Sequence, residues 1–131
     1  MRKKLFTIAA ISSSITMWIL AGLWHEVIMS QFYSEEAHAT HEGTGIIFIA
    51  YLVLGIIMTY FYSPNRTEKR SYITGLKFGA IMGILWIFPH ELAMAGAHGT
   101  SILYVFKNAL WHIVEQGAGG IVIAVILKRA E

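Results

Sequence analysis

The sequence has 131 residues, of which 56% are apolar and only 14% are charged. One water-soluble domain cannot bury that much apolar surface, so the composition excludes an ordinary soluble globular protein. The formal net charge of +2 comes from Lys and Arg that mostly flank the apolar blocks, which argues against nucleic acid as a partner. The absence of Cys excludes disulfides, thiolate zinc sites and iron–sulfur clusters.

Apolar residues fall into four long blocks, at about residues 5–29, 44–62, 72–95 and 102–127. Each block is close to the roughly 20 residues that a helix needs to cross the hydrocarbon of a bilayer. Lipid offers no water to backbone N–H and C=O groups, and these blocks lack the alternating polar pattern of barrel strands, so we expect helices. The sequence therefore predicts an all-α integral membrane four-helix bundle that forms one domain over residues 1–131.

The first block follows a positively charged start, from Arg2 to Lys4, and so has the outline of a signal peptide. Its apolar run is longer than the central region of a signal peptide, and no small-x-small cleavage pattern follows it. We therefore expect the first block to be retained as a transmembrane helix.

Positive charges gather on one side of the expected bundle. These charges are Arg2, Lys3, Lys4, Arg66, Lys69, Arg70, Lys128 and Arg129. The loops on the opposite side carry Glu35, Glu36 and Glu42 and contain no Lys or Arg. By the positive-inside rule, the positive side is cytoplasmic. We expect a multi-pass protein of a bacterial inner (plasma) membrane, with lipid as its partner and both chain ends in the cytoplasm.

Pro64 and Asn65 mark a short turn between the second and third blocks, so the helices are expected to pair as two hairpins. Each hairpin has Gly, Trp, His and Glu near the end of its first helix, which predicts a weak internal duplication. These residues are Gly22, Trp24, His25 and Glu26 in one hairpin, and Gly83, Trp86, His90 and Glu91 in the other.

Gly75, Gly79 and Gly83 lie four residues apart in the third block. Small residues at this spacing form a ridge that lets another helix approach closely. The simplest prediction is a packing face within the chain, and the alternative is a face for oligomerisation.

Each predicted helix or its outer mouth carries one His and one Glu. The pairs are His25 and Glu26, His41 and Glu42, His90 and Glu91, and His112 and Glu115. The topology places the first three pairs at the outer ends of the helices. If the Lys107 side chain extends to the outer interface, His112 lies about 6 Å below it, so all four pairs can share one layer near the periplasmic face.

An ionisable group inside a membrane costs roughly 3 kcal/mol by insertion scales and normally faces a partner or a water-filled path. Imidazole and carboxylate ligands suit Zn, Fe or Cu, and inward His and Glu build the metal sites of helical bundles. The first hypothesis is therefore a metal site near the outer face, with His25, Glu26, His90, Glu91, His112 and Glu115 as candidate ligands. Its variant is a haem with two axial ligands among His25, His90 and His112.

Two other functions fit the same residues. In a proton-coupled or ion transporter, Glu26, Glu91 and Glu115 exchange protons along the bundle. In an accessory subunit of a larger membrane complex, the His and Glu side chains form hydrogen bonds between helices or subunits. No catalytic motif is recognised, so enzyme activity stays an open question, and a homo-oligomer is compatible with each hypothesis.

A structural role is the simpler interpretation of several of these residues. His25 and Glu26 can meet interfacial water, His41 and Glu42 can lie in a solvated loop, and Pro89 can kink the helix beside His90 and Glu91. The Trp and Tyr side chains fall mostly near predicted interfaces and are expected to be headgroup anchors.

Two stretches, Ala21 to Trp24 and Lys107 to His112 with the following Gly119 and Gly120, resemble a family of small uncharacterised bacterial four-helix integral membrane proteins. The resemblance concerns the layout of most of the chain. It implies the four-helix topology and no activity. The His–Glu pairs are not part of the pattern of that family, so no role is transferred to them.

Overall fold

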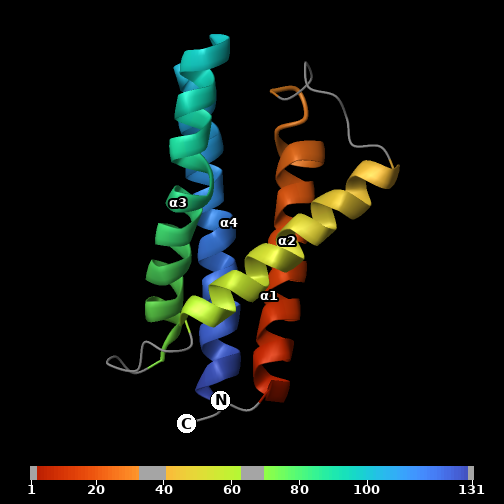
Figure 1. Cartoon of the computed structure of the whole chain (residues 1–131), viewed down its shortest axis with the longest axis vertical. Helices are drawn as coiled ribbons and strands as arrows, with labels where there is room; N and C mark the ends of the chain where they lie inside the picture. The colour runs from red at the N-terminus through yellow and green to blue at the C-terminus, as the bar shows by residue number, and fades with distance from the viewer. Residues whose placement is uncertain (1–2, 33–40, 63–69, 130–131) are drawn as a thin grey trace.

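The computed structural model describes residues 3–32, 41–62 and 70–129 (Figure 1). Its elements are α1 (Lys3–Gly22), the π-helical turn η1 (Leu23–Ile28), α2 (His41–Tyr62), α3 (Tyr72–His98) and α4 (Ile102–Lys128). Four segments are long and apolar enough to cross a membrane: Lys3–Ile28, Gly43–Tyr62, Tyr72–His98 and Ile102–Lys128. For this part of the chain, the predicted all-α class with four candidate membrane helices is confirmed.

Local signals explain both ends of α3. At its start, the Ser71 hydroxyl accepts a hydrogen bond from the Thr74 N–H, and Thr74 Oγ1 accepts one from the Ser71 N–H, which forms a capping box. At its end, Gly99 adopts a left-handed conformation with φ 73° and donates its N–H to the Ala95 carbonyl. This cap extends α3 to His98, beyond the predicted end at about residue 95.

The end of the first helix differs from the prediction of a regular α-helix. Leu23–Ile28 form a π-helical turn, and the Met29 N–H donates to the Trp24 carbonyl, five residues earlier, at 2.8 Å. A π-turn holds more residues than an α-turn and therefore changes the directions of the side chains on it. The α-helical period thus does not give the directions of Trp24, His25 and Glu26.

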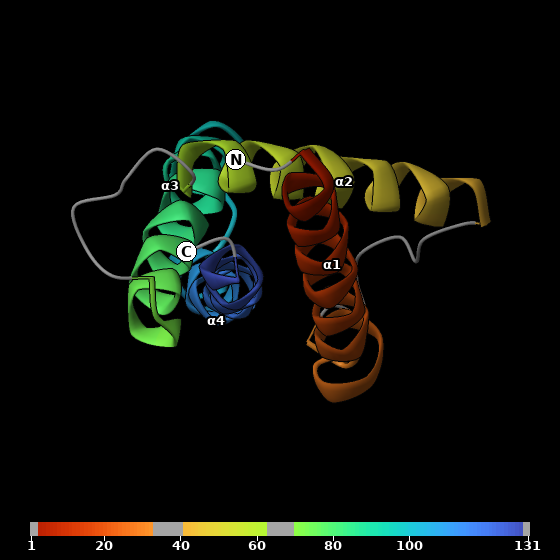
Figure 2. The same ribbon diagram turned by 90° about the horizontal axis from the view of Figure 1, so that it is seen from below.

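Three helices run along the long axis of the molecule, and α2 crosses α1 diagonally (Figures 1 and 2). The start of α1 and the end of α4 lie at the same end of the molecule (Figure 1). The opposite end contains η1 and the connection from α3 to α4. We call these two parts of the bundle the terminal half and the loop half.

The closest helix pair is α3 with α4, and its contact depends on glycine. A Cβ atom at Gly75, Gly79 or Gly83 would collide with the carbonyl oxygens of Gly120, Gln116 and His112 respectively. Only residues without a side chain permit this approach of the two backbones. The predicted packing face within the chain is confirmed for α3 and α4, and the ridge is therefore not a free surface.

The terminal half holds an apolar core shared by α1, α2 and α4. Its buried members are Ala9, Met17, Leu54, Met58, Tyr62, Ile123, Ala124 and Leu127. Arg70 lies beside this core. We expected it to be one of the flanking loop charges, but it is only 7% exposed and its Nη1 donates to the Leu127 carbonyl at 2.8 Å. Arg70 thereby satisfies a carbonyl at the negative end of α4.

Candidate functional site

Glu115 is the central residue of α4, with 13 residues on either side within Ile102–Lys128, and its side chain is fully buried. At 1.5 Å per residue it lies about 20 Å from each end of the helix. Two N–H groups hold its carboxylate. Trp111 Nε1 donates to Oε2 at 3.1 Å, and Gln116 Nε2 donates to Oε1 at 2.6 Å.

Three elements surround this carboxyl group. His112, one turn earlier on α4, places its Nδ1 3.6 Å from Glu115 Oε1. Tyr51 of α2 is a further close neighbour, and its phenol interacts directly with Glu115. Trp24 of η1 stacks on Trp111 with ring centroids 4.3 Å apart and planes only 4° from parallel. Trp111, one of the two donors to Glu115, is thus itself contacted by η1, and α2 adds Tyr51 beside the carboxyl group.

The charge of Glu115 has no basic counterpart of the usual kind. Among residues 3–32, 43–62 and 70–129, no Lys or Arg forms an ion pair with it, and the ionisable groups that contact it include His112 and Tyr51. Two buried polar atoms beside it, His112 Nδ1 and Gln116 Oε1, have no hydrogen-bond partner in this part of the chain. Buried polar atoms normally have partners, so the surroundings of Glu115 can accept one more proton.

A second polar contact joins α3 to α4. Asn108 Nδ2 donates to Glu91 Oε1 at 2.8 Å, and Asn108 lies one helical turn before His112. Polar side chains therefore follow one another from the loop half to the middle of the bundle. We call this set the polar column; its members are Glu91, Asn108, His112, Glu115 and Gln116.

On the terminal side, the polar column ends against packed helices. Ser13 of α1 is fully buried and donates its hydroxyl to the Gly119 carbonyl at 3.1 Å. A Cβ atom at Gly119 would lie 2.7 Å from the Met17 sulfur, so α1 and α4 are in close contact here. The apolar core follows directly.

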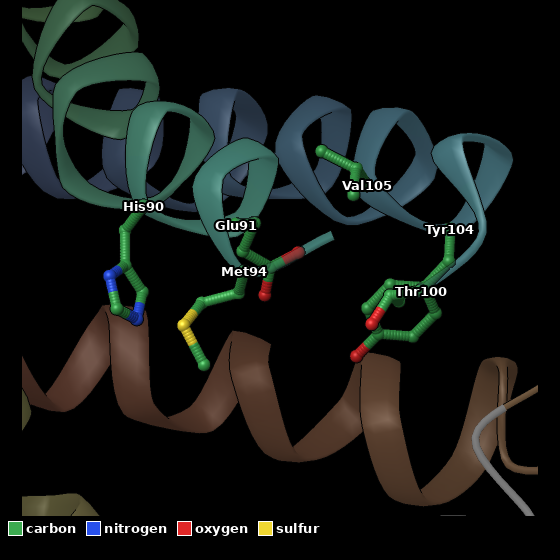
Figure 3. A pocket seen from close by; sticks show the side chains of 6 residues that line it. All are labelled: His90, Glu91, Met94, Thr100, Tyr104 and Val105. Atoms are coloured by element: carbon green, nitrogen blue, oxygen red, sulfur yellow. The ribbon is translucent and has the colours of Figure 1, made fainter. Parts of the chain in front are cut away.

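On the loop side, the column opens on a cavity of about 120 Å³. Its lining comes from the end of α3, the start of α4 and the connection between them: His90, Glu91, Met94, Thr100, Tyr104 and Val105. Figure 3 shows the imidazole, the thioether and the hydroxyl groups of Thr100 and Tyr104 directed toward the same side of α3 and α4. The polar column therefore has an opening at one end and a closed, apolar end at the other.

The predicted ligands for which the structure gives contacts fall into two separate contacts, Glu91 with Asn108 and His112 with Glu115. Glu91 and His90 line the cavity, and His112 with Glu115 lies deep in α4. In η1, His25 is half-buried and Glu26 is exposed. Within the described segments, no group of three or more His, Asp or Glu side chains could hold a metal ion. The side chains of His41 and Glu42 lie outside the described residues, so the metal and haem hypotheses stay predictions.

Some residues of the site were not recognised in the sequence. We expected Trp24, Trp111 and Tyr51 to be headgroup anchors, but Trp111 bonds Glu115, Trp24 stacks on Trp111 and Tyr51 contacts Glu115. The four-residue spacing of Trp111 and Glu115 is a usable signal, because such residues are neighbours on a helix. No comparable signal marks Tyr51, whose position depends on how α2 crosses the bundle.

No known protein family, curated protein or solved structure matches this sequence. The resemblance to small bacterial four-helix membrane proteins is not tested by these comparisons and stays a prediction.

Proposed function

We propose that this protein is a proton-coupled membrane transporter in which Glu115 binds and releases the proton. The observation that carries the proposal is the position of this carboxyl group: fully buried at the midpoint of a candidate membrane helix and held by neutral N–H donors. An acidic group at such a place normally marks an ion or proton path.

The neighbours of Glu115 can serve both of its protonation states. The carboxylate accepts the N–H groups of Trp111 and Gln116. The neutral acid needs an acceptor for its O–H, and His112 Nδ1 and Gln116 Oε1 are buried acceptors beside it. Proton transfer from Glu115 Oε1 to His112 Nδ1 produces a carboxylate and an imidazolium, which stabilise each other in a medium of low dielectric constant.

The proton reaches Glu115 from the loop half. The polar column leads from the cavity to Glu115, whereas the apolar core and the contact of Ser13 with Gly119 close the terminal half. By the positive-inside rule, the loop half faces the periplasm and both chain ends face the cytoplasm. With this orientation, the proposed transport cycle starts from a state open to the outside and requires a second state in which α1 and α4 separate near Gly119.

Proton flux into liposomes tests this proposal. The purified protein is reconstituted with a pH-sensitive dye inside the vesicles, and a pH step is applied with the membrane potential clamped. Glu115→Gln keeps the shape of the side chain but cannot carry a proton, so flux should fall to the level of protein-free vesicles. The sequence alone suggested Glu26 as a further proton carrier, but its side chain is exposed, so Glu26→Gln is the control and should retain flux. Equal flux in wild type and Glu115→Gln would exclude this role.

A metal-binding protein is the second candidate. It is favoured by two imidazole–carboxylate combinations: His90 with Glu91 at the cavity, and His112 with Glu115 on α4. Elemental analysis and an optical spectrum of the wild type beside the His112→Ala/Glu115→Ala double variant separate the candidates. Stoichiometric metal or a haem band that is lost in the double variant would favour the metal site over proton transport.

A further inference from the structure

The cavity at the loop end has an unusual combination of side chains for a membrane protein. One carboxylate, Glu91, lines it together with the thioether of Met94 and the aromatic ring of Tyr104, and no Lys or Arg among the described residues lines it (Figure 3). The transport proposal above assigns no solute to this cavity.

The geometry points to a binding site for a small alkylammonium cation in this cavity, with Glu91 as its counter-ion and Tyr104 as its aromatic contact. The cation is also the solute that is exchanged for the proton on Glu115. This role of the cation rests on the proposed function, whereas the binding site itself does not.

The charge of the cavity selects a cation. Glu91 Oε1 accepts a hydrogen bond from Asn108, which orients the carboxylate at the cavity wall. Glu91 is the only acidic residue of the lining among the described residues, and its carboxylate attracts a single positive charge. An anionic solute would meet a charge of its own sign.

The apolar part of the lining selects an alkylated cation over a bare metal ion. Aromatic faces attract ammonium groups, and methionine sulfur is polarisable and packs well against methyl groups. Aromatic rings at this end of the bundle already hold a cation: Tyr104 stacks on Phe32, and Lys107 Nζ lies 4.6 Å from the centre of the Phe32 ring.

A transition metal fits the cavity less well. His90 and Glu91 are its only strong ligands, while protein sites for Zn normally use three or four. Within the described segments, no third His, Asp or Glu joins them. The remaining polar groups of the cavity are neutral hydroxyl groups and a thioether.

The volume of the cavity indicates the size of a cation that it can hold. A protein cavity of about 150 Å³ accepts benzene, so a cavity of about 120 Å³ suits an ion of about four non-hydrogen atoms. Trimethylammonium has this size and keeps one N–H for the carboxylate. It is therefore the probe for the experiment.

A short chain of contacts connects this cavity to Glu115. Asn108 bonds Glu91 and lies one turn from His112, whose Nδ1 is 3.6 Å from Glu115 Oε1. A cation that draws Glu91 toward itself competes for the same carboxylate as Asn108. Occupancy of the cavity can thereby alter the surroundings of the proton site without direct contact.

The experiment is calorimetric titration of the full chain in lipid nanodiscs with trimethylammonium chloride, with sodium chloride as the reference salt. Glu91→Gln can still accept the Asn108 hydrogen bond but loses the charge, so the Kd should rise about tenfold or more. Tyr104→Leu should raise the Kd about threefold to tenfold through loss of the cation–π contact. Tyr60→Leu, at an exposed Tyr of α2, is the matched control and should leave the Kd unchanged.

The outcomes separate the binding site from the proposed function. Binding that weakens in both Glu91→Gln and Tyr104→Leu supports the site, and Tyr104→Leu alone decides if Glu91→Gln does not fold. No binding of trimethylammonium, or equal binding in the two variants and wild type, overturns it, even if flux depends on Glu115. Tight binding of Zn²⁺ that excludes trimethylammonium also overturns it. Binding without any Glu115-dependent proton flux, measured with trimethylammonium present, supports the site and contradicts transport.

Discussion

The two halves of this bundle differ in what fills the space between the helices. In the terminal half, apolar side chains and glycine contacts bring the helices together, as at Gly75 against Gly120. In the loop half, the glycine contact at Gly83 is joined by polar side chains, a π-turn and a cavity. This difference suggests a division of labour: the tightly packed half fixes the positions of the helices. The polar half leaves the carboxyl group of Glu115 room to change its hydrogen-bond partners.

The glycine contact offers the strongest test of this difference. In Gly79→Leu, the new side chain collides with the Gln116 carbonyl and must push α3 away from α4. We expect destabilisation of about 3 kcal/mol, because close-packed interfaces accommodate added volume poorly. Unfolding by SDS titration, followed by circular dichroism, measures the loss.

The control for this variant lies on the same helix. Nothing lies within 4 Å of a Cβ atom at Gly96, so Gly96→Ala should be neutral or slightly stabilising. Equal effects of the substitutions at residues 79 and 96 would show that glycine packing does not hold α3 on α4.

Arg70 tests the terminal half in a different way. Arg70→Met keeps an apolar stem but removes the donor to the Leu127 carbonyl. Hydrogen bonds from charged groups are worth about 2 kcal/mol, so a loss of this size is expected in the same SDS titration. Arg129→Met, at an exposed position after α4, should have no measurable effect. A harmless Arg70→Met would mean that the end of α4 does not need this cap.

The smallest expected effect on stability is in the loop half. Trp111→Phe retains a ring to stack on Trp24 but removes the N–H that donates to Glu115. We expect a loss of about 1 kcal/mol, typical of one hydrogen bond, together with slower proton flux. Trp86→Phe, on the exposed side of α3, is the matched control for both measurements. Unchanged flux in Trp111→Phe would mean that this donor does not take part in proton binding.

The sequence predicted the helices well because the physical cause of a membrane helix is local. A run of apolar residues and the need to satisfy backbone groups within one segment both act over about 20 residues. The same holds for the ridge of Gly75, Gly79 and Gly83, whose spacing places them on one face before any partner is known. The cap at Gly99 extended α3 only slightly beyond the predicted boundary.

The candidate site could be predicted only in part. His112 and Glu115 of α4 were recognised as a His–Glu pair, and the structure places them together. We expected four His–Glu pairs to converge in one layer. That expectation assumed that each helix is regular and that its position along the membrane normal is known. The π-turn at Leu23–Ile28 removes the first assumption for His25 and Glu26.

What the sequence by itself determined is the class of protein, the candidate spans and which face of α3 carries glycine. Only the tertiary structure decided that Asn108 bonds Glu91, that Trp24 stacks on Trp111 and that Tyr51 reaches Glu115. Those contacts depend on the register and crossing of whole helices. The glycine contacts set them between α3 and α4, and the diagonal path of α2 sets them for Tyr51 (Figure 1). Hydropathy records how apolar a helix is, but not where along its neighbour it comes to rest.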